Sequence, residues 1–407
     1  MKRLLPVLLL LLAALYGVVA LRPAWQAVVS APHGRDYATY HYATLQALGD
    51  GSGTRGDPYD TAALGRLARA EHTRGTVHPY FYPPPFLLGM LWIAPPWRAP
   101  LSLAEGYRAW FWIQNACLLG VLIGLWRWFR AHPLLLGLLA VTFTPIPDNL
   151  KMGQANLPVL LLVVWGLAGR SGALVGAAAM AKMSPALYLV GWAAQRRWRP
   201  VLVAVATAVV LSLLTLPLVP LATQLSFYRD ILPGFSTGDY HGLTVPISLP
   251  ANHSIPDLFN QLWPGPDAHT LDPRAQRAGE GLSLGLLALL GLLARRRTDA
   301  VGEANLMGAF TVLLLASPVY TYEHHLALML LPCAAVGQAL LSRRLRWGWA
   351  LLVLPAYFLV AWPLYWLRAA QQALPALSWW IQESKPLGMV GITIGCVAAV
   401  LSSEKQA

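Results

Sequence analysis

The N-terminal segment, residues 4–82, contains an apolar run and then a long polar and aromatic interruption. Residues 4–21, LLPVLLLLLAALYGVVAL, form an apolar run long enough to cross a bilayer. Residues 33–50, HGRDYATYHYATLQALGD, and residues 78–85, HPYFYPPP, then interrupt the apolar sequence with polar, aromatic and acidic side chains. We predict an uncleaved first transmembrane helix over residues 4–21, followed by a large outer loop over residues 22–82.

The composition of the chain is that of a polytopic membrane protein. Of its 407 residues, 56% are hydrophobic and 12% are charged, whereas a soluble domain has about 25% charged residues. The apolar segments predict an all-α fold of about twelve transmembrane helices. We expect a single membrane domain, residues 1–407, with a second long outer loop over residues 222–279.

Four local features refine this prediction. Within the first loop, residues 38–48 and 61–70 have mixed polar and apolar faces, which favours two short amphipathic helices along the membrane interface. The prolines at 83–85 predict the start of a second transmembrane helix, because proline is tolerated in a first helical turn. A helix over residues 173–194 is expected to be interrupted at 182–185.

The net charge of +12 comes from short basic clusters at helix ends, at residues 196–197, 295–297 and 343–344. Because Lys and Arg collect on the cytoplasmic side of membrane helices, the basic balance indicates topology and not nucleic-acid binding. Both long loops then face outside. Alternation, however, places Arg127 and Arg130 outside as well, so the topology of the helices between residues 133 and 194 is not settled.

The outer side is where we expect the chemistry. Acidic side chains such as Asp36, Asp60, Asp239, Asp257 and Glu323 fall there. An outer site has no access to cytoplasmic nucleotide sugars, so a natural activated donor is a sugar linked to a polyprenyl phosphate. Its transfer requires a base for the acceptor hydroxyl, cations or dipoles for the leaving phosphate, and an apolar groove for the prenyl chain.

Asp36 and Lys182 are the leading candidates for this chemistry. Asp36 follows the first helix closely and is either a catalytic base or a cap of the next helix, since Asp is a favoured N-cap. Lys182 lies inside an apolar stretch, where an unpaired lysine costs about 3 kcal/mol. It either binds an anionic group or extends to the membrane interface.

Two more polar groups interrupt the apolar sequence. Lys151, Gln154 and Asn156 form one, and Glu323-His324-His325 forms the other. Adjacent helical residues point about 100° apart, so the two histidines are poor ligands for one metal ion. We predict no cofactor and no metal site, because the three cysteines also lack metal-ligand spacing; whether the reaction depends on a metal stays open.

Seven short motifs occur in a fixed order over residues 34–330. They are Gly34-Arg35-Asp36-Tyr37, Pro58-Tyr59-Asp60, Phe81-Tyr82-Pro83-Pro84, Gly153-Gln154-Ala155-Asn156, Lys182 with Pro185, Asn252-His253-Ser254, and Ser317-Pro318 with His324-His325. In this series the chain resembles glycosyltransferase family 87 (GT87, also called DUF2029). Members of that family have the GT-C fold and use polyprenyl phosphate hexoses; mannosyltransferases exemplify it.

The resemblance implies an inverting glycosyltransferase that moves a hexose, mannose above others, to a hydroxyl of a lipid or glycan. It implies a protein of the bacterial inner membrane whose site faces outside, with Asp36 as the base. Donor or phosphate binding is assigned to Lys182, His324, His325, Gln154 and Asn156. Substrate contact is assigned to Arg35, Tyr37, Asp60, Tyr82, Asn252, Ser254 and Glu323.

Two departures from the family pattern leave the sugar open. His253 stands where family members usually carry Gln, and Tyr322 stands near a position where they carry an aromatic residue such as Trp. The alternatives are a transporter or flippase for a lipid-linked glycan, and a GT-C enzyme that uses another lipid-linked sugar. A transporter predicts charges along a central pathway, whereas this sequence places them at one face. The sequence does not identify the acceptor or the oligomeric state.

Overall fold

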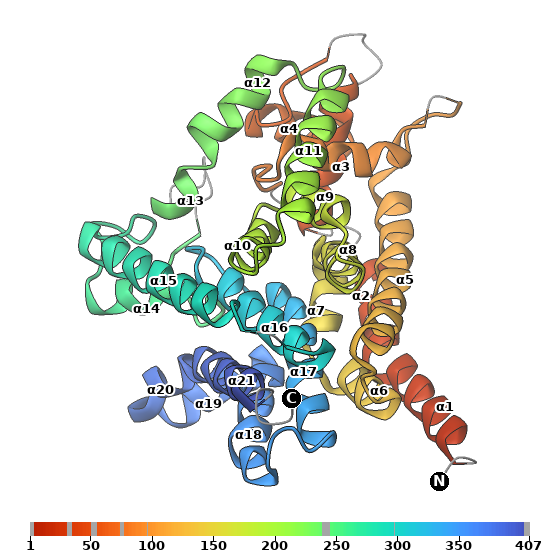
Figure 1. Ribbon diagram of the computed structural model, residues 1–407. Helices are drawn as coiled ribbons and strands as arrows, with labels where there is room; N and C mark the ends of the chain where they lie inside the picture. The colour runs from red at the N-terminus through yellow and green to blue at the C-terminus, as the bar shows by residue number, and fades with distance from the viewer. Residues whose placement is uncertain are drawn as a thin grey trace.

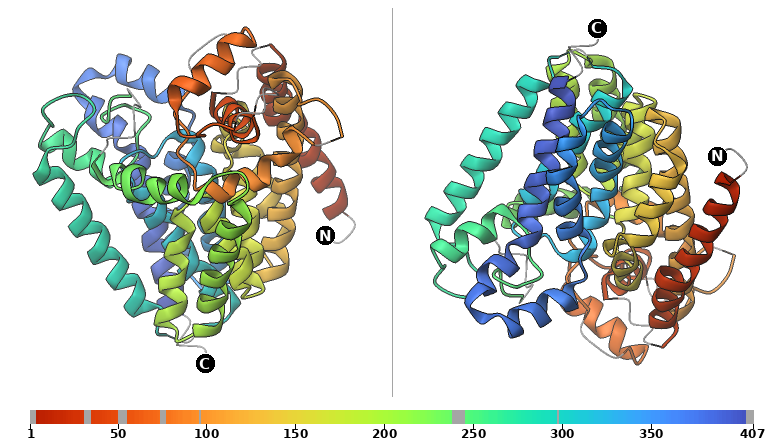
Figure 2. Two further views of the ribbon diagram at one scale, coloured as in Figure 1. Left: turned by 90° about the horizontal axis from the view of Figure 1, so that it is seen from above. Right: turned by 90° about the horizontal axis from the view of Figure 1, so that it is seen from below.

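The computed structural model describes residues 4–30, 35–49, 55–73, 77–95, 97–237, 245–296 and 298–402. Over these residues the chain is a bundle of helices without a β-strand (Figure 1), which confirms the all-α prediction. Figure 2 shows that most of the helices run between two ends of the bundle. One end carries the C-terminus, and the other carries α3, α4 and α19.

The helices differ widely in length, and several are short. They are α1 (Leu5–Tyr16), α2 (Arg22–Ser30), α3 (Arg35–Leu48), α4 (Thr61–Ala70), α5 (Leu103–Phe129), α6 (Pro133–Thr142), α7 (Pro145–Met152), α8 (Asn156–Ala168), α9 (Gly172–Ala181), α10 (Leu187–Ala194), α11 (Trp198–Thr215), α12 (Leu221–Ser226), α13 (Gly234–Thr237), α14 (Ile255–Leu262), α15 (Pro273–Leu293), α16 (Ala300–Ala316), α17 (Leu330–Leu341), α18 (Ala350–Ala361), α19 (Leu364–Ala373), α20 (Ser378–Gln382) and α21 (Ser384–Leu401). Two 3₁₀ helices are important for the site, η2 (Pro84–Ile93) and η5 (Glu323–Met329).

Several helices are long and apolar enough to cross a membrane. In the described part of the chain there are five: Leu5–Ser30, Leu103–Phe129, Trp198–Thr215, Glu323–Leu341 and Pro375–Leu401. The number rises to seven if α6–α7, bent by 57°, and Trp347–Ala361 with α19, bent by 96°, each form one span. The chain is therefore an integral membrane protein, but the predicted twelve spans are not confirmed.

The segment Pro84–Ile93 begins and ends beside one aromatic cluster. Phe86, near its start, has its ring centroid 4.9 Å from that of Tyr40 in α3. Trp92, near its end, stacks on Trp110 of α5 at 6.3 Å, and the rings of Tyr40 and Trp110 are 6.4 Å apart. Because both ends meet the same cluster, η2 does not carry the chain across the bundle, in contrast to the second transmembrane helix predicted there.

Helices α9 and α10 form a hairpin that turns at Lys182. Arg170 precedes α9 and Arg197 follows α10, and both guanidinium groups pair with the carboxylate of Glu303. The helix predicted over residues 173–194 is therefore interrupted where expected, but its two halves return to the same end.

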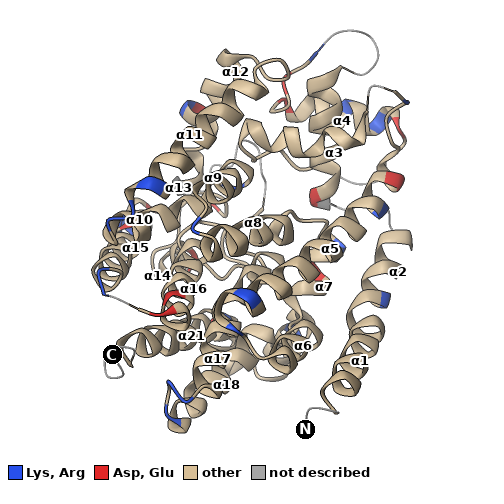
Figure 3. Ribbon diagram, turned by 45° about the vertical axis from the view of Figure 1, so that its right-hand side comes forward, with Lys and Arg blue, Asp and Glu red and all other residues tan. Residues whose placement is uncertain are grey.

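With these two differences, arginines that follow several separate helices lie at one end of the bundle. The Arg127 guanidinium, near the end of α5, lies 6.0 Å from the ring of Trp165 near the end of α8, the helix that precedes Arg170. Arg344 pairs with Asp299, the N-cap of α16, at 2.5 Å. These arginines share one end of the bundle, which we call the basic end; Figure 3 shows how little charge lies along the helices between the ends.

Helix α3 has a different environment from the one predicted. The side chains from Tyr37 to Leu45 are all buried, and the Tyr37 ring stacks on Tyr107 of α5 with 5.5 Å between centroids. It is therefore a core helix and not an interfacial one. Helix α4 fits the prediction better, because it buries Leu64 and exposes Arg66. The first helix also extends beyond Leu21, since α2 continues it to Ser30.

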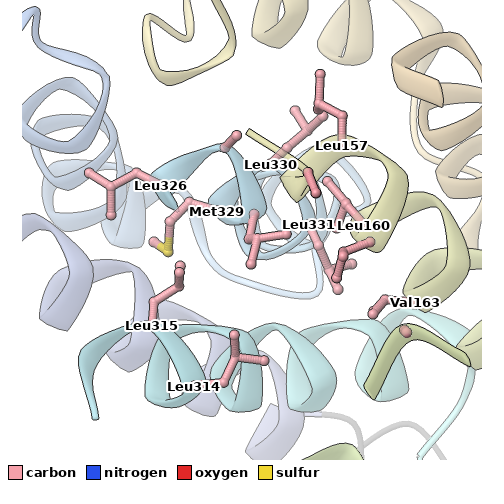
Figure 4. Packing of buried hydrophobic residues seen from close by; sticks show 14 of the residues in the cluster. Leu157, Leu160, Val163, Leu314, Leu315, Leu326, Met329, Leu330 and Leu331 are labelled. Carbon is pink, nitrogen blue, oxygen red and sulfur yellow. The ribbon is translucent and has the colours of Figure 1, made fainter. Parts of the chain in front are cut away.

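An apolar core lies behind η5 and fixes its position. Figure 4 shows Leu157 and Leu160 of α8 beside Leu330 and Leu331, with Leu314 and Leu315 of α16 on another side. All six side chains are buried. Because η5 carries His324 and His325, this packing fixes where their imidazoles lie.

We predict that Gly176→Val destabilises the protein by about 1–3 kcal/mol, the usual cost of overpacking. A Cβ atom at Gly176 would lie 2.6 Å from the backbone oxygen of Ala204 in α11, so α9 and α11 must separate. Gly285→Val in α15 is the matched control, because a Cβ there meets nothing within 4 Å. Thermal unfolding in detergent measures both, and equal shifts would contradict the packing argument.

Candidate functional site

A cavity of about 950 Å³ lies between α3, α7, the turn at Lys182, η5 and α19. We call it the central cavity. It brings together seven of the predicted site residues, which come from five separate parts of the sequence. These residues are Asp36, Tyr82, Gln154, Lys182, Glu323, His324 and His325.

Asp36 lies in the first turn of α3, where the helix dipole favours a negative charge. Its Oδ2 accepts a hydrogen bond from Nε2 of Gln154 at 3.3 Å and lies 3.6 Å from Nε2 of His324. The carboxylate is mostly buried, with 19% of its side chain exposed. It is thus accessible from the cavity while its orientation is fixed by groups from two other elements.

The phenols of Tyr40 and Tyr82 fix the orientation of the Gln154 amide. Both hydroxyls hydrogen-bond Oε1 of Gln154, Tyr40 at 2.5 Å. Burial raises the pKa of each phenol well above its usual value, so both stay protonated and can donate. With Oε1 occupied by these donors, the NH₂ group of Gln154 must face Asp36.

The left-handed glycine that ends α7 places Gln154. Gly153 ends α7 in the left-handed region with φ of 69°, a conformation that favours glycine. A Cβ at this position would also lie 2.7 Å from Cβ of Tyr37. The Gly-Gln pair is therefore required locally: glycine makes the turn and glutamine then points into the cavity.

Lys182 stands at the turn between α9 and α10. Helix α9 ends at Ala181, and Lys182 has the extended backbone angles φ −155° and ψ 119°. The Pro185 ring restricts the residue before it and prevents α9 from continuing. The Lys182 ammonium donates to Oδ1 of Asn156 at 2.7 Å, and its side chain lines the cavity.

Glu323 belongs to a buried ionic group at the cavity wall. Its Oε1 lies 2.9 Å from Nε2 of His253, and its Oε2 lies 3.1 Å from Nζ of Lys385. Lys385 also donates to the carbonyl oxygens of Val360 and Trp362. Burial lowers the pKa of His253 despite the opposing effect of the Glu323 charge. With both its oxygens engaged, Glu323 is a weaker candidate for the base than Asp36.

The comparison with protein-family models decides the identity of the chain. The model of glycosyltransferase family 87 matches residues 80–318, which is more than half of the sequence. The chain belongs to glycosyltransferase family 87. It is thus a membrane glycosyltransferase. No curated protein and no solved structure matches it.

The GT87 match includes Tyr82, Gln154 and Lys182 but ends before η5 and begins after Asp36. The contribution of Asp36 and His324 to the site therefore comes from the tertiary contacts described above. Their separation of almost 300 positions in the sequence shows how far the cavity depends on long-range packing.

Other predicted residues lie outside the cavity lining. Asn156 is fully buried behind Lys182. Asn252 and Ser254 donate to the carbonyl of Val319 and so fix the segment that leads into η5. Asn252 is 1% exposed, which leaves no room for glycosylation at its Asn-X-Ser pattern.

Three more predicted residues are not placed at the cavity by described contacts. Tyr37 is buried against Tyr107, and Asp60 is an exposed N-cap of α4 that accepts from the Ala63 N–H at 3.0 Å. The side chain of Arg35, together with Gly34 and Asp239, lies outside the described residues.

Sequence reasoning did not find several groups at or behind the cavity. Tyr40 and Arg368 line it, and Lys385 holds Glu323 from behind. A single tyrosine or arginine on an amphipathic helix carries no local signal of a site. Lys385 had one signal, a cation at the start of an apolar helix, which is costly unless paired. Among the described residues, no group of three or more His, Cys, Asp or Glu side chains could hold a metal ion.

We predict that Lys385→Met destabilises this glycosyltransferase by roughly 3–5 kcal/mol, the cost of leaving one partner of a buried ion pair unpaired. Lys385 and Glu323 are almost fully buried, so no solvent compensates the lost contact. Thermal unfolding in detergent measures the loss. The double variant Lys385→Met, Glu323→Gln should recover part of it, and a double variant as unstable as the single one would exclude the ion pair as the cause.

Proposed function

We propose that this glycosyltransferase moves a hexose, with mannose as first choice, from a polyprenyl phosphate to a hydroxyl of a lipid or glycan acceptor. The observation that carries the proposal is the meeting of Asp36, His324 and Lys182 at one cavity. It supplies a carboxylate for proton removal beside a cation for the leaving phosphate, which are the two groups that such a transfer requires.

In the proposed reaction Asp36 is the catalytic base. It takes the proton of the acceptor hydroxyl as that oxygen attacks the anomeric carbon. The bond between this carbon and the phosphate oxygen breaks, and the phosphate leaves with the electron pair. The attack opposite the leaving group inverts a β-linked donor into an α-glycoside, which requires room for both substrates in line.

The leaving phosphate is assigned to the cationic side of the cavity. The Lys182 ammonium lies there at the turn between α9 and α10, and the imidazoles of His324 and His325 also line the cavity, on η5, with 4.4 Å between their centroids. The apolar side chains Leu232, Phe235 and Leu364 line the same cavity and suit a prenyl chain. Tyr82 and Glu323 are assigned to substrate contact.

The proposal includes a GT-C fold with about twelve crossings, in which several crossings are short or broken helices. We place the basic end in the cytoplasm, following the distribution of Lys and Arg. The cavity then faces the extracytoplasmic side of a bacterial inner membrane. Since α3 and α19 border the cavity at the end opposite the basic end, this placement directs the cavity away from the cytoplasm.

A flippase for a lipid-linked glycan is the competing function. It requires a polar pathway between the two ends of the bundle. Behind η5 the described residues instead form the apolar packing of Leu157, Leu330 and Leu314. This favours transfer at one end over passage through the bundle. A GT-C enzyme that uses another lipid-linked sugar differs only in the donor, and a screen of donors decides it.

We predict that Asp36→Asn lowers the turnover number at least a hundredfold, since general base catalysis contributes about 10²–10⁴-fold. The variant should fold normally, because an amide can still accept from Gln154. A radiolabelled polyprenyl phosphate mannose assay in detergent measures it. Asp60→Asn, which changes an exposed carboxylate outside the cavity, is the matched control. Normal turnover by Asp36→Asn would remove Asp36 from the mechanism.

We predict that Lys182→Met raises the KM for the donor by about tenfold, which corresponds to roughly 1.4 kcal/mol, because the donor phosphate loses the cation that we assign to it. The acceptor KM should not change. Lys151→Met is the control, since Lys151 also lines the cavity but is paired with Asp148 at 3.2 Å. An unchanged donor KM in Lys182→Met would contradict the assignment of the phosphate.

A further inference from the structure

Three buried amide side chains form a chain behind the cavity wall. Gln114 comes from α5, Asn149 from α7 and Asn156 from α8, and each is fully buried. Nδ2 of Asn149 donates to Oε1 of Gln114 at 2.6 Å, and Nδ2 of Asn156 donates to Oδ1 of Asn149 at 2.9 Å. None of the three lines the central cavity.

The hydrogen bonds of this amide chain run in one direction. Oε1 of Gln114 accepts a hydrogen bond from Nδ2 of Asn149. The NH₂ group of Asn149 therefore faces Gln114, and its oxygen faces Asn156. That oxygen in turn attracts the NH₂ group of Asn156, which leaves Oδ1 of Asn156 facing Lys182. A reversed Asn156 amide would point N–H groups at an ammonium, which cannot accept them.

The amide chain also contacts the other groups around Asp36. Nδ2 of Asn149 donates to the backbone oxygen of Gln154 at 3.2 Å, and Nδ2 of Asn156 donates to the backbone oxygen of His324 at 2.9 Å. Gln154 and His324 both contact the Asp36 carboxylate. One buried network thus touches the Lys182 cation and two of the groups beside the Asp36 carboxylate.

We propose that Gln114 and Asn149 are positioning residues, which act through Asn156 to hold the Lys182 ammonium at the donor phosphate. This rests on the proposed function, in which Lys182 binds that phosphate. The oxygen of Asn149 contributes to this orientation, because it accepts from Nδ2 of Asn156 together with the backbone oxygen of His324 and so directs Oδ1 of Asn156 toward Lys182. Nε2 of Gln114 has no hydrogen-bond partner among the described residues, so Gln114 serves as the acceptor that starts the chain.

Two substitutions of Asn149 separate positioning from simple core packing. Asn149→Leu removes the oxygen and takes one acceptor from Nδ2 of Asn156, so the Asn156 amide is held less firmly toward Lys182. Asn149→Asp keeps an oxygen toward Asn156, and the free Nε2 of Gln114 can rotate to donate to the second one. If Asn149 only fills the core, the buried charge of Asn149→Asp must be at least as harmful as leucine. If Asn149 instead positions Asn156, leucine should change the labelling pH of Lys182 and the donor KM more than aspartate does.

The matched control is Asn305→Leu. Asn305 of α16 is also a fully buried amide that donates twice to backbone oxygens, to Val301 at 2.8 Å and to Ala335 at 3.1 Å. It lies six residues after the α16 cap Asp299, at the basic end, and does not line the cavity. If the loss of a buried amide were sufficient by itself, Asn305→Leu would shift the labelling pH of Lys182 as much as Asn149→Leu does.

The first measurement is the pH at which acetic anhydride half-labels Lys182, followed by mass spectrometry of the purified full-length protein. Asn149→Leu should shift this pH downward, because an ammonium without its oxygen partner loses its proton more easily. Asn149→Asp and Asn305→Leu should not shift it downward. A Lys182 profile in Asn149→Leu equal to that of the wild type would overturn the proposal, and this result does not depend on any enzymatic activity.

The second measurement is steady-state kinetics with a polyprenyl phosphate mannose. Asn149→Leu should raise the donor KM by about tenfold, as expected for Lys182→Met, and leave the acceptor KM unchanged; Asn149→Asp should stay within about threefold of the wild type. A shifted labelling profile with an unchanged donor KM would keep the positioning role and reject phosphate binding by Lys182. If Asn149→Leu does not fold, Gln114→Leu removes the first acceptor and should shift the labelling pH in the same direction.

Discussion

Polar groups inside an apolar bundle are stable only when they have partners, and the structure depends on this requirement. Asp36 meets Gln154 and His324, Lys182 meets Asn156, and Glu323 meets Lys385. Each contact joins elements that are distant in the sequence. The cavity walls are therefore held by hydrogen bonds and ion pairs, while the apolar packing of α8, α16 and α17 supplies the frame around them.

The breaks in the helices occur where the chain borders the central cavity. Irregular backbone at membrane depth is tolerated only where protein buries it or where it lines a cavity. The turn at Gly153, the extended residue Lys182 and the start of η5 at Glu323 all occur at the cavity. Each break exposes a polar side chain that a continuous helix would direct into lipid or into a neighbouring helix.

Much of the candidate site was predictable because polar residues are costly in apolar sequence. Gln154, Lys182 and His324 were predicted in this way, and Asp36 from its position after the first helix and from the family motif; the structure brings all four to one cavity. Tyr37, also predicted, instead packs in the core. Amides such as Gln114 were missed, because a single amide in a helix looks the same whether it faces a cavity, a partner or the lipid headgroups.

The membrane class, the helical fold and the family could be predicted from the sequence, because hydrophobicity and short motifs are properties of local segments. The sequence also predicted the interruption at residues 182–185, where α9 has ended at Ala181 and η3 (Ser184–Ala186) begins. Three features depend on the tertiary structure: both ends of η2 meet one aromatic cluster, α10 returns to the basic end, and Asp36 meets His324. These outcomes depend on which distant partners satisfy each buried polar group, and that choice is made by packing across the whole bundle.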